Sequence, residues 1–165
     1  MFCAACVLST APANVGLSPA NTRVDFTAFA LGVIPIHGRF DRFSGSLTLD
    51  PTHPEACSVN VQIAAASLSL PNPAMQADVL SRGFFDPQDY PAIAFQGQCG
   101  QGGLAGQLTL HGQTHPLSMH ISRRRSGFVA TATIRRYGWG ITARPVLAGP
   151  VITIRISVAM RDASQ

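Results

Sequence analysis

Lysine is absent from this chain, and charge of either sign is scarce. All 12 basic residues are arginine, only 8 residues are acidic, and charged residues make up 12% of the 165 positions, whereas hydrophobic residues make up 46%. A composition so low in charge excludes an intrinsically disordered chain. It also indicates apolar surface that faces something other than water, such as an internal cavity. We interpret the missing lysine as a compositional bias of the genome and not as chemistry.

Long hydrophobic runs and aromatic side chains other than phenylalanine are also scarce. No stretch approaches the roughly 18 apolar residues of a membrane-spanning helix, so no integral membrane span is predicted. Tryptophan occurs once and tyrosine twice. The arginine cluster at 123–125 therefore has few aromatic neighbours on which bases stack, which argues against nucleic acid as a partner. The net charge of +4 permits an anionic partner, although a scattered, solvated surface charge is the simpler explanation.

The first 13 residues are expected to lie outside the folded domain. Residues 2–8 are apolar, and Ala-Pro-Ala at 11–13 resembles the small-x-small pattern of a signal-peptide cleavage site. No basic residue precedes this short apolar run. We therefore interpret residues 1–13 as the remnant of a signal peptide that begins upstream, with an ordinary N-terminal segment as the alternative. Residues 14–165 would then form a single domain that is periplasmic or secreted.

Alternation of apolar and polar residues runs through most of the chain, and helical periodicity is nearly absent. About eight strands are expected, at residues 24–30, 43–50, 57–65, near 93–95, 104–111, 117–124, 128–136 and 151–161. The segment 67–91 is too long for a hairpin, and residues 73–83 within it can form a short helix. Eight antiparallel strands, each with one apolar face, can close into a barrel just wide enough for one small ligand. A two-sheet sandwich fits the same alternation.

Four segments of the sequence, in order along the chain, carry a resemblance to a known family. They are residues 36–47 (IHGRFDRFSGSL), 84–95 (FFDPQDYPAIAF), 106–117 (GQLTLHGQTHPL) and 136–141 (RYGWGI). Over roughly residues 17–160 the chain resembles the YceI-like, polyisoprenoid-binding β-barrel proteins. It departs from their pattern at His115, where a lysine is common, and at Gly138, where an aspartate is usual. The resemblance implies an all-β fold, an extended eight-stranded antiparallel lipocalin-like β-barrel with a short helical insertion.

The same resemblance implies non-catalytic binding, transport or storage of a long apolar isoprenoid lipid inside the barrel, with no cofactor. Polyprenyl quinones and polyprenyl phosphates are the expected ligand types. Strand parity and the resemblance together predict these residues as the wall of the ligand site: Phe26, Phe40, Phe43, Val61, Phe95, Leu108, Met119, Ile134, Trp139, Ile154 and Ile156. An enzyme acting on a lipid in the same barrel and a stress-related structural protein without a ligand remain as alternatives. A homodimer is also left open.

Groups suited to catalysis or metal binding are few. His111, His115 and His120 lie around one expected hairpin, but no cysteine or carboxylate joins them at the spacing of a metal site, so we expect exposed histidines. No G-x-S-x-G nucleophile motif is present. The sequence thus predicts neither a catalytic residue nor a metal site. Arg136, if it projects toward the barrel end, would meet a polar head group.

Cys57 and Cys99 are predicted to form a disulfide. They lie at opposite ends of two expected strands, and pairing Val61 with Phe95 in antiparallel register also pairs Cys57 with Cys99 on the same face. An exported protein would meet the oxidising conditions under which disulfides persist. A Cα–Cα separation above about 7 Å would rule out the bond.

Overall fold

Most of the described chain is β-strand. The computed structural model describes residues 13–31, 33–50, 53–100, 103–142 and 148–159. Within these residues, one antiparallel sheet of eleven strands has the spatial order β1-β4-β5-β7-β8-β9-β10-β11-β2-β3-β6. The strands are β1 (Ala13–Leu17), β2 (Thr22–Ala30), β3 (Ile34–Phe40), β4 (Phe43–Asp50), β5 (His53–Ala64), β6 (Leu68–Ser69), β7 (Ala92–Gly100), β8 (Gly103–Leu110), β9 (Gln113–Arg124), β10 (Gly127–Arg135) and β11 (Ala148–Ala159).

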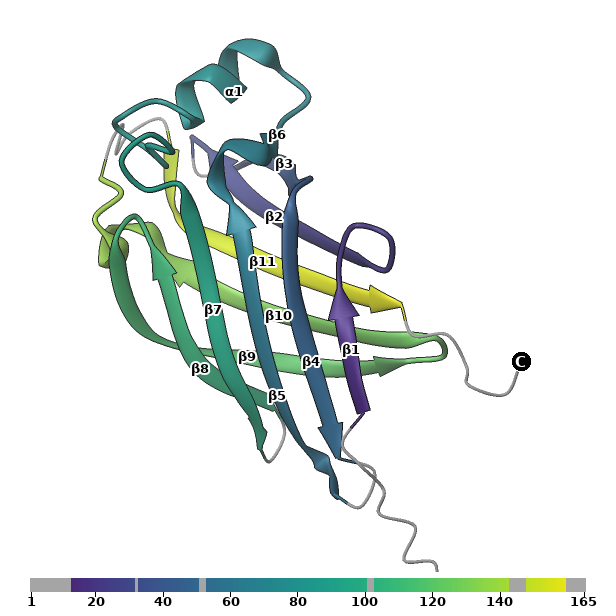
Figure 1. Ribbon diagram of the computed structural model, residues 1–165. Coiled ribbons are helices and arrows are strands. Elements are labelled where there is room, and N and C mark those ends of the chain that lie inside the picture. Colours follow the sequence, from purple (N-terminus) through teal and green to yellow (C-terminus); the bar gives the residue numbers. More distant parts are fainter. Residues whose placement is uncertain (1–12, 32, 51–52, 101–102, 143–147, 160–165) are drawn as a thin grey trace, which may run out of the picture.

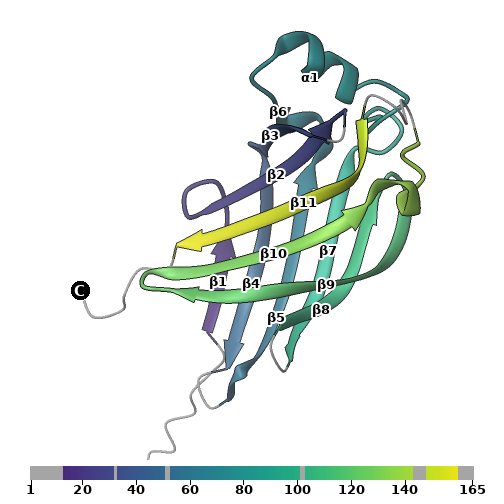
Figure 2. The same ribbon diagram turned by 180° about the vertical axis from the view of Figure 1, so that it is seen from behind.

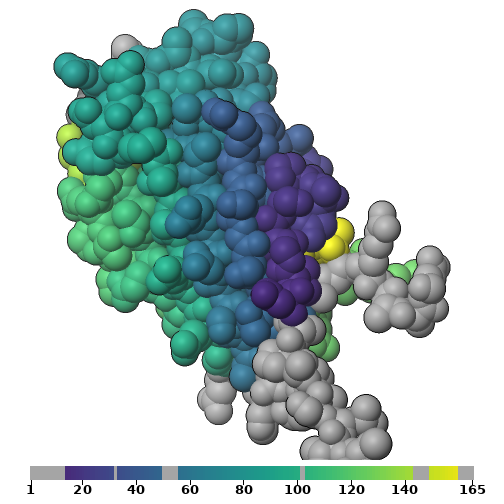
Figure 3. All heavy atoms as spheres, in the orientation of Figure 1, coloured from purple at the N-terminus to yellow at the C-terminus, as the bar shows by residue number. Residues whose placement is uncertain are grey.

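The sheet curls on itself into a half-barrel. In Figure 1, β4, β5 and β7 form the front wall and β9, β10 and β11 cross behind it, and Figure 2 shows this back wall from the other side. β1 pairs with β4, and Figure 3 shows it along the edge of the front wall. The helix α1 (Pro73–Val79) lies over one end of the half-barrel. The concave face is therefore enclosed by strands from distant parts of the sequence.

The alternation of the strands decides which side chains face inward. On β5, Val61 and Ile63 are buried and Gln62 between them is exposed. On β9, Met119 is buried and His120 is exposed. Because successive side chains of a strand point to opposite faces, the apolar set lines the inside and the polar set meets solvent. The predicted all-β, antiparallel barrel-like fold is confirmed.

The number of strands is larger than the eight expected. Those eight are present, and β1, β3 and β6 are added. β3 contains Pro35 and Gly38, which disfavour a central strand. β6 pairs only with Arg39 and Phe40 of β3, so among the described residues no strand pairs with β3 on this side at Pro35. Proline is tolerated at such an edge because its missing N–H is not needed for a ladder hydrogen bond. A side chain at position 38 would collide with the ring of Phe26, so glycine permits this close packing.

The helical insertion is shorter than the predicted range 73–83. α1 begins after Asn72, whose side-chain oxygen accepts hydrogen bonds from the backbone N–H of Ala74 at 3.0 Å and of Met75 at 3.1 Å. Proline at the first helical position fits this N-terminus because its missing N–H would be unpaired there anyway. Met75 and Val79 pack against the core. Beyond Val79 the chain continues in turns as far as Phe85.

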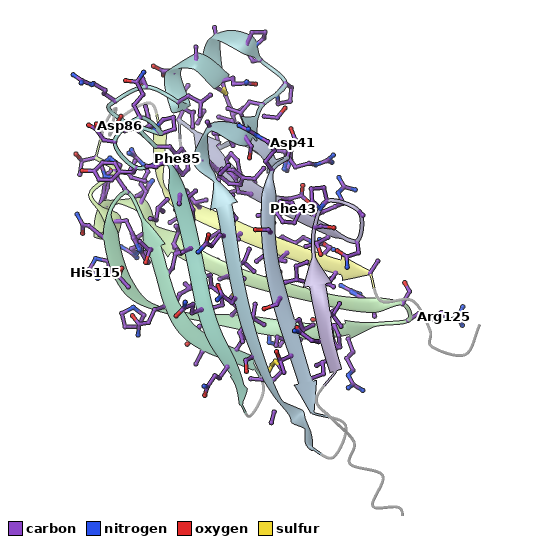
Figure 4. The ribbon with its side chains drawn as sticks, in the orientation of Figure 1. Asp41, Phe43, Phe85, Asp86, His115 and Arg125 are labelled. Carbon is purple, nitrogen blue, oxygen red and sulfur yellow. A yellow bond between two sulfur atoms is a disulfide. The ribbon has the colours of Figure 1, made fainter. Side chains whose placement is uncertain are left out.

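Three phenylalanine rings close the half-barrel beneath α1. The ring centroids of Phe26 and Phe40 are 5.7 Å apart, and those of Phe40 and Phe85 are 6.1 Å apart in an edge-to-face arrangement. Phe85 follows α1 in sequence and is buried, and Figure 4 labels it below the helical segment. Aromatic pairs of this geometry add stabilisation beyond their buried area. The cluster anchors the insertion to the barrel and ends the interior at this side.

Candidate functional site

A hollow of about 240 Å³ lies inside the half-barrel at the end away from α1. We call it the distal cavity. Its walls come from β1, β4, β5 and β7 to β11, and they are almost entirely aliphatic or aromatic, including Leu47, Val59, Leu104 and Ile121. Ala130, one of the small inward-facing residues of β10, also contributes to the wall. A small side chain at this position leaves volume that larger apolar neighbours do not fill.

A smaller hollow of about 50 Å³ continues the interior toward α1. This central cavity is bounded by the Phe26–Phe40–Phe85 cluster and by aliphatic residues of the surrounding strands. The two cavities share four lining residues, which are Val61, Phe95, Met119 and Ile156. They therefore adjoin inside the half-barrel, and the central cavity is the one on the side of the aromatic cluster.

The disulfide between Cys57 and Cys99 is part of the wall of the distal cavity. Its Cα atoms are 4.8 Å apart, and the pairing of β5 with β7 matches Val61 with Phe95, as the sequence predicted. Both cysteines lie at inward-facing positions and both line the cavity. The predicted disulfide is thus confirmed in this structure. It fastens the front wall at the cavity end away from α1.

Most of the residues predicted as the ligand wall meet at these two cavities. Phe26, Phe40, Val61, Phe95, Leu108, Met119, Ile134, Ile154 and Ile156 line one or both of them. The other two, Phe43 and Trp139, lie elsewhere. Phe43 is half-buried and packs against the core, and Figure 4 shows it on β4. A ligand-binding role for all eleven stays a prediction.

Trp139 lies in a short 3₁₀ turn, Arg136–Trp139, and not on a strand. Its indole N–H donates a hydrogen bond to the carbonyl oxygen of Leu108 at 3.1 Å, and the side chain is buried. A buried indole N–H needs such a partner because leaving it unpaired is costly. The hydrogen bond to β8 therefore explains the position of Trp139 without a ligand.

The histidines around the β8–β9 hairpin contact aromatic rings. His111 packs on Tyr90 with ring centroids 4.4 Å apart, and His115 meets Trp139 edge-on at 5.3 Å. Both are half-buried, so the prediction that they are exposed is wrong for these two. His120 is exposed on the outer face, as predicted. Across the described residues, no three His, Cys, Asp or Glu side chains are grouped so that they could hold a metal ion. The observed contacts give His111 and His115 a packing role.

Arg136 is buried beside a groove between α1 and β2, the α1 groove, of about 790 Å³. Its Nε donates to the carbonyl oxygen of Gly149 and its Nη1 to that of Ile141, both at 2.9 Å. Burial lowers the pKa of this guanidinium, and Tyr137 partly opposes the shift. Its side chain joins the turn after β10 to Ile141 and to the first residues of β11. This structural use differs from the head-group contact considered from the sequence.

Arg123 is a residue of the distal cavity that the sequence analysis did not assign to the wall. It follows Leu117, Met119 and Ile121 at the next inward-facing position of β9. Among the described residues that line this cavity, it is the one that carries a charge. The signal was present in the parity of the strand expected at 117–124, but only apolar residues were assigned to the predicted wall.

The comparisons with known proteins agree with this architecture. The family model described as "YceI-like domain" matches residues 16–160. A UPF0312 protein of Pseudomonas putida (strain W619) is 30% identical over 151 residues, covering 82% of this chain and 78% of that relative. A UPF0312 protein of Vibrio cholerae (strain El Tor Inaba N16961) is 30% identical over 138 residues, covering 74% of this chain and 73% of that relative.

Two solved structures share the fold. BcnA of Burkholderia cenocepacia superimposes with a TM-score of 0.73 at 19% identity, covering 88% of this chain and 99% of that one. A polyisoprenoid binding domain from Saccharophagus degradans has a TM-score of 0.61 at 12% identity, covering 90% of this chain and 99% of that one. The described part of this chain has no helix with the length and hydrophobicity needed to cross a membrane. From the match of the family model and the curated relatives, the chain belongs to the YceI-like family.

Proposed function

We propose that the protein binds a long apolar isoprenoid lipid, without chemical conversion, in the interior formed by the distal and central cavities. The observation that carries the proposal is the pair of adjoining apolar hollows, whose walls share Val61, Phe95, Met119 and Ile156. Additional support comes from the family and from the similarly folded Saccharophagus degradans domain, whose name describes polyisoprenoid binding. The polyprenyl chain would lie along the half-barrel axis, with its tail toward the aromatic cluster.

The driving force for such binding is the removal of apolar surface from water. Each buried CH₂ group contributes about 0.8 kcal/mol, so ten buried carbons contribute roughly 8 kcal/mol before the costs of association and ordering. Phenylalanine and methionine, present at Phe95 and Met119, provide adaptable contacts for a flexible branched chain. The lining therefore supplies affinity for a tail by burial alone.

A binding function is favoured over catalysis by the chemistry of the walls. Two charged side chains occur among the described residues of the two linings, Arg123 in the distal cavity and Asp25 beside the central cavity. The carboxylate of Asp25 forms an ion pair with Arg39 at 3.3 Å on the outer side of the barrel. General acid–base or nucleophilic catalysis needs titratable groups that converge on one reacting atom. Arg123 and Asp25 belong to different cavities, so these two charged groups do not converge on one reacting atom.

We also propose that the protein acts outside the cytoplasm, in the periplasm or as a secreted protein. The support is the apolar segment of residues 2–8 with the Ala-Pro-Ala site at 11–13, together with a disulfide. Residues 1–12 lie outside the described residues, and β1 starts at Ala13. Export would place the protein where isoprenoid lipids must cross water between apolar environments.

The lipid proposal is tested by extracting the protein as purified from its native host. Organic extraction followed by mass spectrometry should release an isoprenoid lipid in near-stoichiometric amount. A parallel extraction of a similarly purified protein without an apolar cavity measures the background. An extract with no isoprenoid above that background, combined with no uptake of added polyprenol by the lipid-free protein, would contradict the proposed function.

A further inference from the structure

The placement of Arg123 gives the distal cavity a chemical polarity. On β9, Leu117, Met119 and Ile121 occupy successive inward-facing positions, and Arg123 takes the next one, opposite Phe128 of β10. Its side chain is exposed and yet lines the cavity, so it lies at the opening where the apolar interior meets solvent. The interior therefore passes from apolar walls to a cation at one end.

The guanidinium of Arg123 lies beside an aromatic ring. Its central carbon is 5.8 Å from the ring centroid of Phe128, which is within the range of a cation–π contact. No described carboxylate forms an ion pair with Arg123, and none lines the distal cavity. Within the described part of the chain, no carboxylate competes with a ligand for the N–H donors of this side chain.

Two more arginines lie on the same hairpin but outside the cavity. Arg124 faces outward on β9, and Arg125 lies in the two-residue turn before β10, where Figure 4 shows it at the hairpin tip. Both are exposed and neither lines the cavity. They add positive potential around the opening, while Arg123 alone of the three has a position from which it can contact a molecule whose tail fills the cavity.

We propose that Arg123 binds the anionic head group of the lipid, and that the preferred ligand is a polyprenyl phosphate or diphosphate and not a neutral polyprenol or quinone. This inference rests on the proposed lipid-binding function. A guanidinium presents a planar fork of N–H donors that matches two phosphate oxygens, and such charge-assisted hydrogen bonds are stronger than neutral ones. The phosphate would remain at the solvent-exposed opening, and the tail would extend toward Phe95 and the aromatic cluster.

The opposite end of the interior supports this orientation. The central cavity ends at the Phe26–Phe40–Phe85 cluster, which contacts a terminal hydrocarbon well and a phosphate poorly. Arg136, which lines the α1 groove together with Phe26 and Phe85, has donors bound to the carbonyl oxygens of Gly149 and Ile141. A phosphate at the Arg123 end and a tail at the Phe85 end therefore match the chemistry of the two ends.

The test compares two probes that differ only in the head group, geranylgeranyl phosphate and geranylgeraniol, with the delipidated full chain. We expect the wild-type protein to bind the phosphate more tightly than the alcohol. Arg123→Gln should weaken binding of the phosphate about tenfold and leave binding of the alcohol unchanged, and Arg123→Lys should retain part of the preference. The matched control Arg124→Gln, which removes the same charge one position away and outward, should bind the alcohol as the wild type does and should lose far less affinity for the phosphate than Arg123→Gln loses.

The outcomes separate this inference from the proposed function. If the wild-type protein binds both probes equally, or if Arg123→Gln weakens both to the same extent, the head-group role is wrong while lipid binding stands. If Arg124→Gln weakens phosphate binding as much as Arg123→Gln does, a general surface potential replaces the specific contact and the inference is also overturned. If the wild-type protein binds neither these probes nor longer polyprenyl chains, the proposed function itself fails.

Discussion

Loss of the Cys57–Cys99 cross-link should lower the free energy of unfolding by about 4 kcal/mol. The two cysteines are separated by 42 residues in the sequence. In the chain-entropy description, closing a loop of this length removes about 13 cal/mol/K of entropy from the unfolded chain, which corresponds to about 4 kcal/mol at 25 °C. Since a domain of this size loses about 2–4 °C in Tm for each kcal/mol, we expect Tm to fall by roughly 8–16 °C.

Urea unfolding followed by circular dichroism measures this effect. The parent protein should carry Cys3→Ala and Cys6→Ala, so that Cys57 and Cys99 are its only thiols. Comparison of the oxidised and reduced parent isolates the cross-link, because both forms keep the same side chains in the cavity wall. A second comparison uses Cys57→Ala/Cys99→Ala, whose midpoint should be close to that of the reduced parent and should not respond to reductant.

Two results would refute this reasoning. If the oxidised and reduced parent unfold at the same urea concentration, the cross-link does not restrict the unfolded chain as the calculation assumes. If titration of the untreated parent finds two free thiols, the disulfide is not formed in solution.

Three further predictions concern the interior, the N-terminus and the fold. Ala130→Trp should fill the distal cavity and abolish lipid co-purification while the fold is retained. The control Thr131→Trp, which faces outward, should keep the lipid. Equal lipid content in the two variants would contradict the proposed binding site. N-terminal sequencing of protein from the native host should begin near Asn14, and an intact Met1 would contradict export. Trp139→Phe should lower the free energy of unfolding by about 1–3 kcal/mol in a urea titration, because the Leu108 carbonyl loses its indole donor.

Strand parity was sufficient to predict the inward face of most strands and the pairing of β5 with β7. The reason is that a period of two is strict within a regular strand, so one correct pair determines the rest of the register. Once Val61 was paired with Phe95, Cys57 and Cys99 necessarily met. Most of the apolar residues that line the cavities followed from the same rule, since they lie at inward-facing positions of their strands, whereas Phe85 lies in the turns after α1.

Parity was insufficient where the chain leaves the regular strand, where local propensity disfavours a strand, and where a charged residue takes an inward-facing position. Trp139 belongs to a 3₁₀ turn, so alternation does not determine its direction, and its hydrogen bond to Leu108 depends on tertiary contact. β3 contains Pro35 and is stabilised by pairing with β2, which local propensity does not include. Arg123 lies at an inward-facing position of the strand expected at 117–124, which ends where β9 ends, but the predicted wall included only apolar residues.

The sulfur atoms of Cys57 and Cys99 form part of the surface that an apolar ligand would cover. Thiol–disulfide exchange requires a thiolate to reach one of these sulfur atoms, so its rate depends on access from the cavity side. A filled interior would exclude a water-soluble reductant from that side, and the loaded protein would be reduced more slowly than the empty one. By thermodynamic linkage, any preference of the lipid for the oxidised protein also raises the free energy needed to reduce it. Lipid binding and the resistance of the Cys57–Cys99 disulfide to reduction would thus be linked, because both depend on the same wall of the distal cavity.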